Sequence, residues 1–234
     1  MSTVAITPLH RVVRFYEAPV GKKAVMASTG VILFGYIVAH LLGNLQIFSS
    51  DPQQINRYAA FLHSPSNAAL LWGARAVLLL AVVLHIVASV QLWKLNHAAR
   101  PRRYVKKDDA ATSYASRTMM WSGPIVAAFV IFHVLHLTTG SIVPLHELGP
   151  NQPDVRANLV NGFSNPLISG FYILGMILLC MHLYHGLWSM FQSVGFGELR
   201  YRPKLKMGAK IFAILIAVGN CSIPIAVMAG LVTK

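Results

Sequence analysis

Residues 166–193 read PLISGFYILGMILLCMHLYHGLWSMFQS and contain no Asp, Glu, Lys or Arg. As a helix that rises about 1.5 Å per residue, this stretch is long enough to cross a hydrocarbon core of about 30 Å. Further apolar runs of membrane-spanning length lie at about residues 24–48, 69–93, 119–140 and 208–232. The sequence therefore predicts an all-α membrane protein, in which five transmembrane helices form one bundle and residues 1–234 make a single domain.

The composition agrees with this fold class, since 55% of the residues are hydrophobic and 12% are charged. A soluble domain has about 25% charged residues. The two cysteines, Cys180 and Cys221, lie in predicted spans, so no disulfide framework is expected. No CxxCH motif occurs, which argues against covalently attached haem. The first apolar run is too long for the core of a signal peptide, and we expect it to remain as a span.

The net charge of +13 is unevenly distributed along the chain. Basic residues gather in the N-terminal arm and in the connections after the second and fourth spans, whereas the other connections hold few. This bias predicts that the N-terminus and both basic connections face the cytoplasm and that the C-terminus lies outside. Membrane topology and attraction to anionic lipid headgroups are sufficient to explain this basic face. Alternatively, the face serves in addition as a docking surface for a cytoplasmic protein. We expect no nucleic-acid partner.

The two outer connections differ in character. Asp51 and Pro52, a side-chain cap followed by proline, predict the start of a short amphipathic helix over residues 53–63 at the outer surface. The outer connection at 141–165 is the longest irregular stretch of the sequence and contains three prolines.

The first four predicted spans each contain a histidine. Two of these histidines lie at a similar depth below the outer surface, and the other two lie at a similar depth below the inner surface. A polar ring in hydrocarbon costs free energy unless it has a partner, so these residues point to a function. At about 1.5 Å per residue, His40 and His133 lie about 12 and 10 Å from the outer ends of their spans. His85 and His182 lie about 12 and 16 Å from the inner ends. The depths predict two pairs, His40 with His133 towards the outside and His85 with His182 towards the inside.

With only two histidines at each depth in the membrane, haem is the metal group that fits best. A tetrahedral zinc site needs four ligands, and the spans contain no Asp or Glu to supply them. A haem needs only two axial imidazoles, because its own nitrogens provide the other four bonds. The sequence thus predicts two b-type haems. His136 and His185 each lie three residues beyond a predicted ligand, on the same helix face, and depth alone allows them as ligands or as partners of a propionate, a quinone or a buried water.

Other polar residues of the spans have less specific interpretations. Arg75 is the only charged residue well inside a span, and it either contacts an outer-haem propionate or quinone oxygen or extends to the outer interface. Near the inner face, Lys23, Ser28 and Arg117 are candidates for contact with the inner-haem propionates.

The sequence resembles a known family at its most specific stretch. FYILG at 171–175, followed by HLYHGLWS at 182–189, is similar to the fourth-helix pattern of the single-chain, five-helix dihaem cytochrome b subunits of succinate:quinone oxidoreductases, which are succinate dehydrogenases and quinol:fumarate reductases. His133 follows Gly123 by ten positions, which matches the third-helix spacing of that family, and His40 in YIVAHL and His85 in VVLHIV match its other ligand positions. The resemblance implies His133 and His182 as ligands in preference to His136 and His185, with the same pairing.

The resemblance also implies partners and a reaction. The chain would pass electrons from a cytoplasmic iron–sulfur subunit, which receives them from a flavoprotein subunit, through the inner and outer haems to a membrane quinone, or in the reverse direction. The resemblance further implies menaquinone or another quinone as the substrate and the bacterial cytoplasmic membrane as the location. The chain would be a subunit of the enzyme without a succinate-oxidising site of its own. Some relatives carry a glutamate two residues before the fourth-helix ligand, where this sequence has Cys180, so a proton path based on glutamate is not expected.

Two alternatives stay open at this point. A dihaem cytochrome b can serve another quinone-linked oxidoreductase, such as a hydrogenase or a formate dehydrogenase. A transporter without haem can use membrane histidines as proton relays, and it would need no pairs at matched depths.

Overall fold

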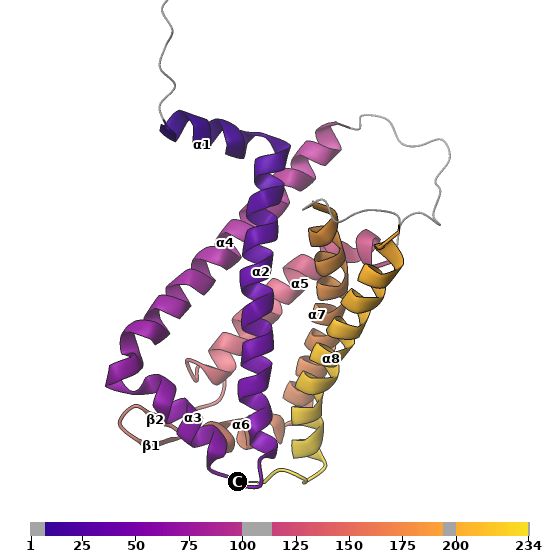
Figure 1. Cartoon of the computed structure of the whole chain (residues 1–234). Coiled ribbons are helices and arrows are strands. Elements are labelled where there is room, and N and C mark those ends of the chain that lie inside the picture. The colour runs from indigo at the N-terminus through magenta and orange to yellow at the C-terminus, as the bar shows by residue number, and fades with distance from the viewer. Residues whose placement is uncertain (1–7, 100–113, 194–199, 234) are drawn as a thin grey trace, which may run out of the picture.

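The computed structural model describes residues 8–99, 114–193 and 200–233, and it is almost entirely helical. The long helices form a bundle, with shorter elements at its ends (Figure 1). The long helices are α2 Pro19–Asn44, α4 Ala68–Ala98, α5 Tyr114–Leu137, α7 Pro166–Ser193 and α8 Arg202–Met228. The shorter elements are α1 Pro8–Glu17, η1 Leu45–Phe48, α3 Gln54–His63, η2 Pro65–Asn67, β1 Glu147–Gly149, β2 Gln152–Pro153 and α6 Val155–Phe163.

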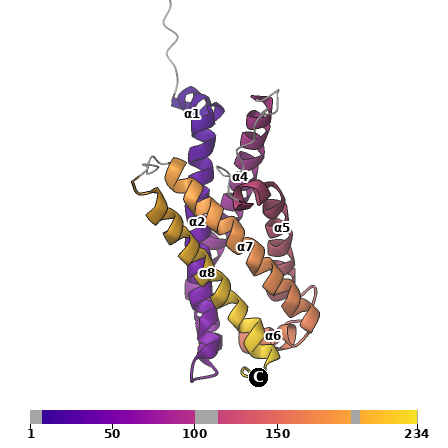
Figure 2. The same cartoon turned by 90° about the vertical axis from the view of Figure 1, so that its right-hand side faces the viewer.

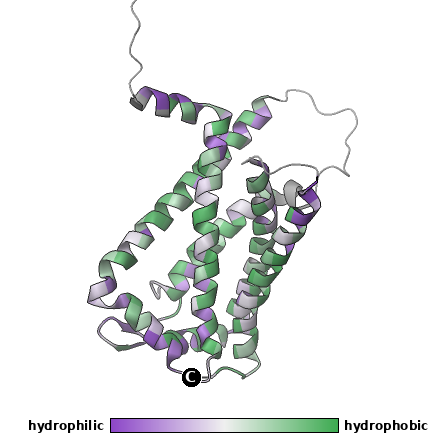
Figure 3. Cartoon of the chain, in the orientation of Figure 1, coloured by the Kyte–Doolittle hydropathy of each residue, from purple (hydrophilic) through white to green (hydrophobic). Residues whose placement is uncertain are grey.

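Four segments of the described residues are long and apolar enough to cross a membrane: Pro19–Phe48, Pro65–Ala98, Pro166–Ser193 and Arg202–Met228. The apolar part of α5, Trp121–Leu137, is shorter. The predicted all-α membrane fold is therefore confirmed, and the chain is a multi-pass membrane protein. The third predicted span, at about residues 119–140, overlaps α5. The count of five spans and the sidedness of the termini stay predictions. The long helices consist mostly of hydrophobic residues, and hydrophilic residues concentrate in α1 and around α3 (Figure 3).

The helices pack in three main pairs, α7 with α8, α2 with α4, and α5 with α7. Figure 2 shows α7 and α8 running side by side along the bundle. A glycine permits the close contact between α5 and α7, because a Cβ atom on Gly175 would overlap the ring of Phe129. Small residues at such contacts are typical of membrane helices, since they let backbones approach closely.

One end of the bundle is closed by a cap formed by α3, α6 and the C-terminal residues up to 233, which we call the outer cap after the predicted topology. Buried Asn56 holds it together, since its Nδ2 donates to Asp154 Oδ1 (3.0 Å) and its Oδ1 accepts from the backbone N–H of Arg156 (3.0 Å). The Arg156 guanidinium donates to the carbonyls of Thr233 (2.8 Å) and Ile47 (3.2 Å). These bonds join the two outer connections to the C-terminal segment, so the cap is one unit.

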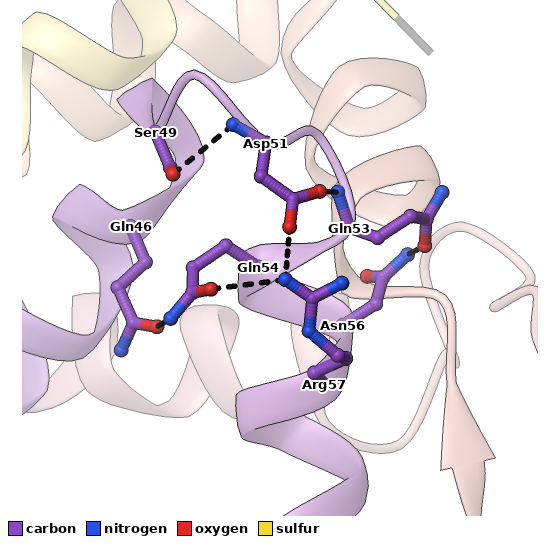
Figure 4. Close-up of polar contacts among 7 residues, drawn as sticks. All are labelled: Gln46, Ser49, Asp51, Gln53, Gln54, Asn56 and Arg57. Carbon is purple, nitrogen blue, oxygen red and sulfur yellow. Dashed lines mark hydrogen bonds and ion pairs between the residues drawn. The ribbon is translucent and has the colours of Figure 1, made fainter.

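The short helix predicted over residues 53–63 is confirmed as α3. Asp51 precedes it and accepts from the backbone N–H of Gln53 (3.0 Å), while its other oxygen forms an ion pair with Arg57 (Figure 4). The hydrogen bond from Arg57 holds the pKa of the Asp51 carboxyl below its usual value, with a further contribution from the Gln53 N–H. Both side chains are solvent-exposed, so the pair orders the turn but adds little stability.

At the opposite end, α1 lies across the start of α2 (Figure 1). Lys22, which is buried, donates from Nζ to the carbonyls of Tyr16 (2.9 Å) and Glu17 (2.7 Å) at the end of α1. A cation at this position also interacts favourably with the helix dipole. The Tyr16 hydroxyl donates to Gln91 Oε1 of α4 (2.9 Å). Helix α1 is therefore attached to the bundle by polar contacts.

Candidate functional site

The first histidine pair joins α2 to α5. The rings of His40 and His133 lie with their centroids 5.7 Å apart and their planes at 88°. Tyr36, one turn earlier on α2, stacks on His40 (5.3 Å, 21°), and Phe129, one turn earlier on α5, stacks on His133 (6.2 Å, 30°). Each imidazole is thus held by an aromatic ring of its own helix and faces the other helix.

The second pair joins α4 to α7 and lies nearer to the end that carries α1. The ring centroids of His85 and His182 are 6.4 Å apart, with an interplanar angle of 62°. His85 Nδ1 lies 3.1 Å from the hydroxyl oxygen of Thr29 on α2. That hydroxyl lies within donating distance of the carbonyls of Val25 (2.7 Å) and Met26 (3.1 Å), so its oxygen is available to accept from His85 Nδ1–H. This tautomer leaves the lone pair of His85 on Nε2.

The two additional histidines are arranged differently from these pairs. His136 is buried, its Nδ1 lies 2.9 Å from the Tyr172 hydroxyl, and its Nε2 side faces Gly162, where a Cβ atom would come within 2.6 Å. His185 Nε2 lies 3.0 Å from Ser189 Oγ, one turn along the same helix. Within the described part of the chain, neither ring contacts an imidazole of another helix. The structure therefore brings together His40 with His133 and His85 with His182.

The ring separation in each pair is close to the one that two axial imidazoles of a single haem would have. With metal–nitrogen bonds of about 2 Å and roughly 1 Å from each nitrogen to its ring centre, two axial imidazoles have centroids about 6 Å apart. The observed separations, 5.7 and 6.4 Å, lie on either side of this value. Among the described residues, no three His, Cys, Asp or Glu side chains gather as a metal site, so a cofactor would have to supply the remaining ligands.

The His182 ring has one buried nitrogen, Nδ1, without a hydrogen-bond partner in the described structure. A buried polar atom left unpaired costs about 1–3 kcal/mol. His136 Nε2 is unpaired in the same way, so an unpaired ring nitrogen does not by itself distinguish a ligand from its neighbour.

The residues considered for propionate contacts lie in different places. Lys23 borders a pocket of about 300 Å³ whose other lining residues are Met26, Leu92, Asn96, Ser189, Gln192 and Ser193. This pocket opens between the helices of the second pair, at the basic end of the bundle. Ser28 is exposed and does not line it. The Arg117 side chain lies outside the described residues.

Arg75 lies near the first pair without contacting it directly. Its guanidinium packs over the ring of Trp72 (4.8 Å), a residue that is largely exposed. In the described structure, Arg75 thus contacts Trp72 and not a histidine of the first pair.

Sequence reasoning missed two hydroxyl groups, those of Thr29 and Tyr172, that contact histidines of both pairs. Both are buried polar residues inside apolar spans. That pattern was a usable signal, because a buried hydroxyl needs a hydrogen-bond partner. The identity of the partner depends on how the helices are rotated, which the sequence does not give directly.

The fold and the site together define a class: a multi-pass, all-α membrane protein whose interior histidines meet in two pairs between helices. A family model described as "Succinate dehydrogenase/Fumarate reductase transmembrane subunit" matches residues 94–220, more than half of the chain. The chain belongs to this family, which confirms the resemblance seen in the fourth helix. The matched part contains His133 and His182, whereas His40 and His85 precede it. No curated protein and no solved structure matches the chain.

Proposed function

We propose that this membrane subunit is a dihaem cytochrome b, which passes electrons between a cytoplasmic iron–sulfur subunit and a membrane quinone in either direction. The observation that supports it most is the meeting of four histidines from four helices as two pairs with haem-like separations. Bound haem would supply one-electron redox chemistry, and the protein would set its position and surroundings. By the family resemblance, the donor of electrons to the iron–sulfur subunit is a flavoprotein and the quinone is menaquinone.

At the inner site, His85 and His182 would be the axial ligands, and Thr29 would fix the orientation of His85. Lys23 would contact a propionate of this haem, because it lines the pocket beside this pair. The exposed Arg200, Lys204 and Lys206 lie at the same end of the bundle. They make this end a plausible dock for a soluble subunit, since clustered positive charge attracts an acidic surface.

At the outer site, His40 and His133 would be the axial ligands, with Tyr36 and Phe129 restricting their rings. The spans contain no Asp or Glu, so a quinone reduced or oxidised near this site would exchange protons with water on the outer side. Electron transfer through this chain would then need no carboxylate relay within the membrane.

Purification of the intact complex tests this function. The chain, tagged and extracted in mild detergent, is expected to bring with it a flavoprotein and an iron–sulfur protein. Addition of succinate should reduce b-type haem in that preparation. A preparation with hydrogenase or formate dehydrogenase subunits would contradict the choice of partner. A preparation that contains no haem would contradict the cytochrome itself and favour a proton-relay transporter.

Single substitutions test the pairing within the same preparation. His40→Ala and His85→Ala should each reduce the haem content from two to one per chain, and they should remove different spectral components. Loss of the same component in both variants would contradict the pairing.

A further inference from the structure

The hydroxyl of Tyr172 lies between two histidines of α5. Its oxygen is 3.3 Å from His133 Nδ1 and 2.9 Å from His136 Nδ1. Tyr172 projects from α7 and is 6% exposed, and its ring packs edge-on against Phe129 and Phe163. A buried phenol with two imidazole nitrogens in reach forms a small closed network.

A phenol that accepted from both imidazoles would leave its own buried hydrogen unpaired, so two arrangements satisfy this network. The phenol has one hydrogen, so it donates to one imidazole and accepts from the other. If Tyr172 donates to His133, the hydrogen of neutral His133 is on Nε2, and no ring nitrogen of His133 is free to bind a metal. If Tyr172 donates to His136, it accepts from His133 Nδ1–H, and the lone pair of His133 is on Nε2. Only the second arrangement allows His133 to be a ligand through Nε2.

The second arrangement also assigns a role to His136. With its Nδ1 accepting from Tyr172, neutral His136 carries its hydrogen on Nε2, which is buried against Gly162 and has no partner among the described residues. The close approach of Gly162 leaves no space for a haem or a quinone on that side of the ring. His136 is thus the last member of the network rather than an alternative ligand.

We propose, on the basis of the cytochrome function above, that Tyr172 is a positioning residue for His133. Its hydroxyl selects the tautomer that can bind iron, fixes the ring orientation and makes the imidazole a stronger donor. Partners of this kind are usual for metal-binding histidines, and their loss typically costs 10–100-fold in metal affinity. Thr29 has the same relation to His85 in the other pair, since it too is a hydroxyl residue from a third helix. Each pair therefore contains one histidine whose ring is oriented by a hydroxyl group.

The test is the Tyr172→Phe variant of the intact complex, because phenylalanine keeps the packing of the ring and removes only the hydroxyl. A weaker imidazole donor stabilises ferric iron less, so the midpoint potential of the outer haem should rise. A tenfold change in the relative stability of the two iron states corresponds to about 59 mV for one electron. The outer component of the redox titration is the one missing in His40→Ala, and the inner haem serves as the internal reference.

Two control variants separate positioning from general disturbance. Tyr184→Phe removes a hydroxyl from the same helix that has no hydrogen bond in the described structure, and it should leave the outer potential unchanged. Thr29→Val should shift the inner component and leave the outer one in place. Unchanged potential and content of the outer haem in Tyr172→Phe would overturn the positioning role while leaving the cytochrome function intact. Absence of haem from the unmodified complex would overturn both.

Discussion

His182 and His185 lie one helical turn apart on α7, but only His182 faces an imidazole of another helix. His185 instead contacts Ser189 of its own helix, so its polar atoms are used locally. The spacing of residues along a helix therefore does not decide between them, whereas the direction of each ring does. The same distinction separates His133 from His136 on α5, where Tyr172 contacts both rings and only His133 faces His40.

At this scale, we expect His182→Ala to lose the inner haem and His185→Ala to retain close to two haems per chain. The first change removes one of two axial ligands, and the second removes a hydrogen bond within a helix. Haem content per chain, measured as the pyridine haemochrome, checks the prediction. Equal losses from both substitutions would contradict the assignment of His182 as the ligand.

Among the elements, the contact between α5 and α7 depends on a single glycine. Gly175 is buried, and a Cβ atom there would overlap the Phe129 ring that stacks on His133. A methyl group at position 175 can be accommodated only if the Phe129 ring moves. Because that ring stacks on His133, its movement would also shift the outer histidine pair.

Gly175→Ala is therefore expected to destabilise the bundle by about 1–3 kcal/mol, the usual cost of overpacking, and to weaken retention of the outer haem. Gly170→Ala is the matched control, since Gly170 lies on the same helix with nothing within 4 Å of its Cβ position. There the alanine should be neutral or slightly stabilising, because it favours helix by up to about 1 kcal/mol relative to glycine. Thermal loss of the Soret band in detergent compares the two, and equal midpoints would contradict the packing argument.

The position of α1 depends on Lys22, whose ammonium group binds the last carbonyls of that helix. Lys22→Met keeps the apolar stem and removes these bonds, so α1 should detach from the bundle while the haem content stays the same. Hydrogen exchange of α1 in the intact complex is expected to rise by at least tenfold. Arg14→Met, at an exposed position of α1, is the control and should leave exchange unchanged. Unaltered protection in Lys22→Met would show that other contacts hold the helix.

For the whole molecule, the sequence predicted the fold class because hydropathy is a local sum over each span. The helices nevertheless extend beyond several predicted spans, as in α4, which begins at Ala68 and continues to Ala98. Helical hydrogen bonding does not stop where the hydrocarbon ends, so apolar runs mark the membrane-embedded part more closely than the helix limits. Depth along the spans also predicted which histidines lie near each other, since residues at matched depths on neighbouring helices can meet.

The contacts of Thr29 and Tyr172 could not be predicted in this way. Each hydroxyl reaches a histidine of a different helix, so the contact depends on the rotation and tilt of two helices at once. The outer cap had the same limitation, because Asn56 joins residues that are about a hundred positions away in the sequence. Local sequence patterns do not show which residues of two distant segments will contact each other.

The haem content of the intact complex is the most direct test of the central claim. The reduced-minus-oxidised spectrum, with quantification of haem per chain, should show two b-type haems with the low-spin bands of bis-histidine ligation. A value of zero or one haem per chain in the unmodified complex would contradict the account.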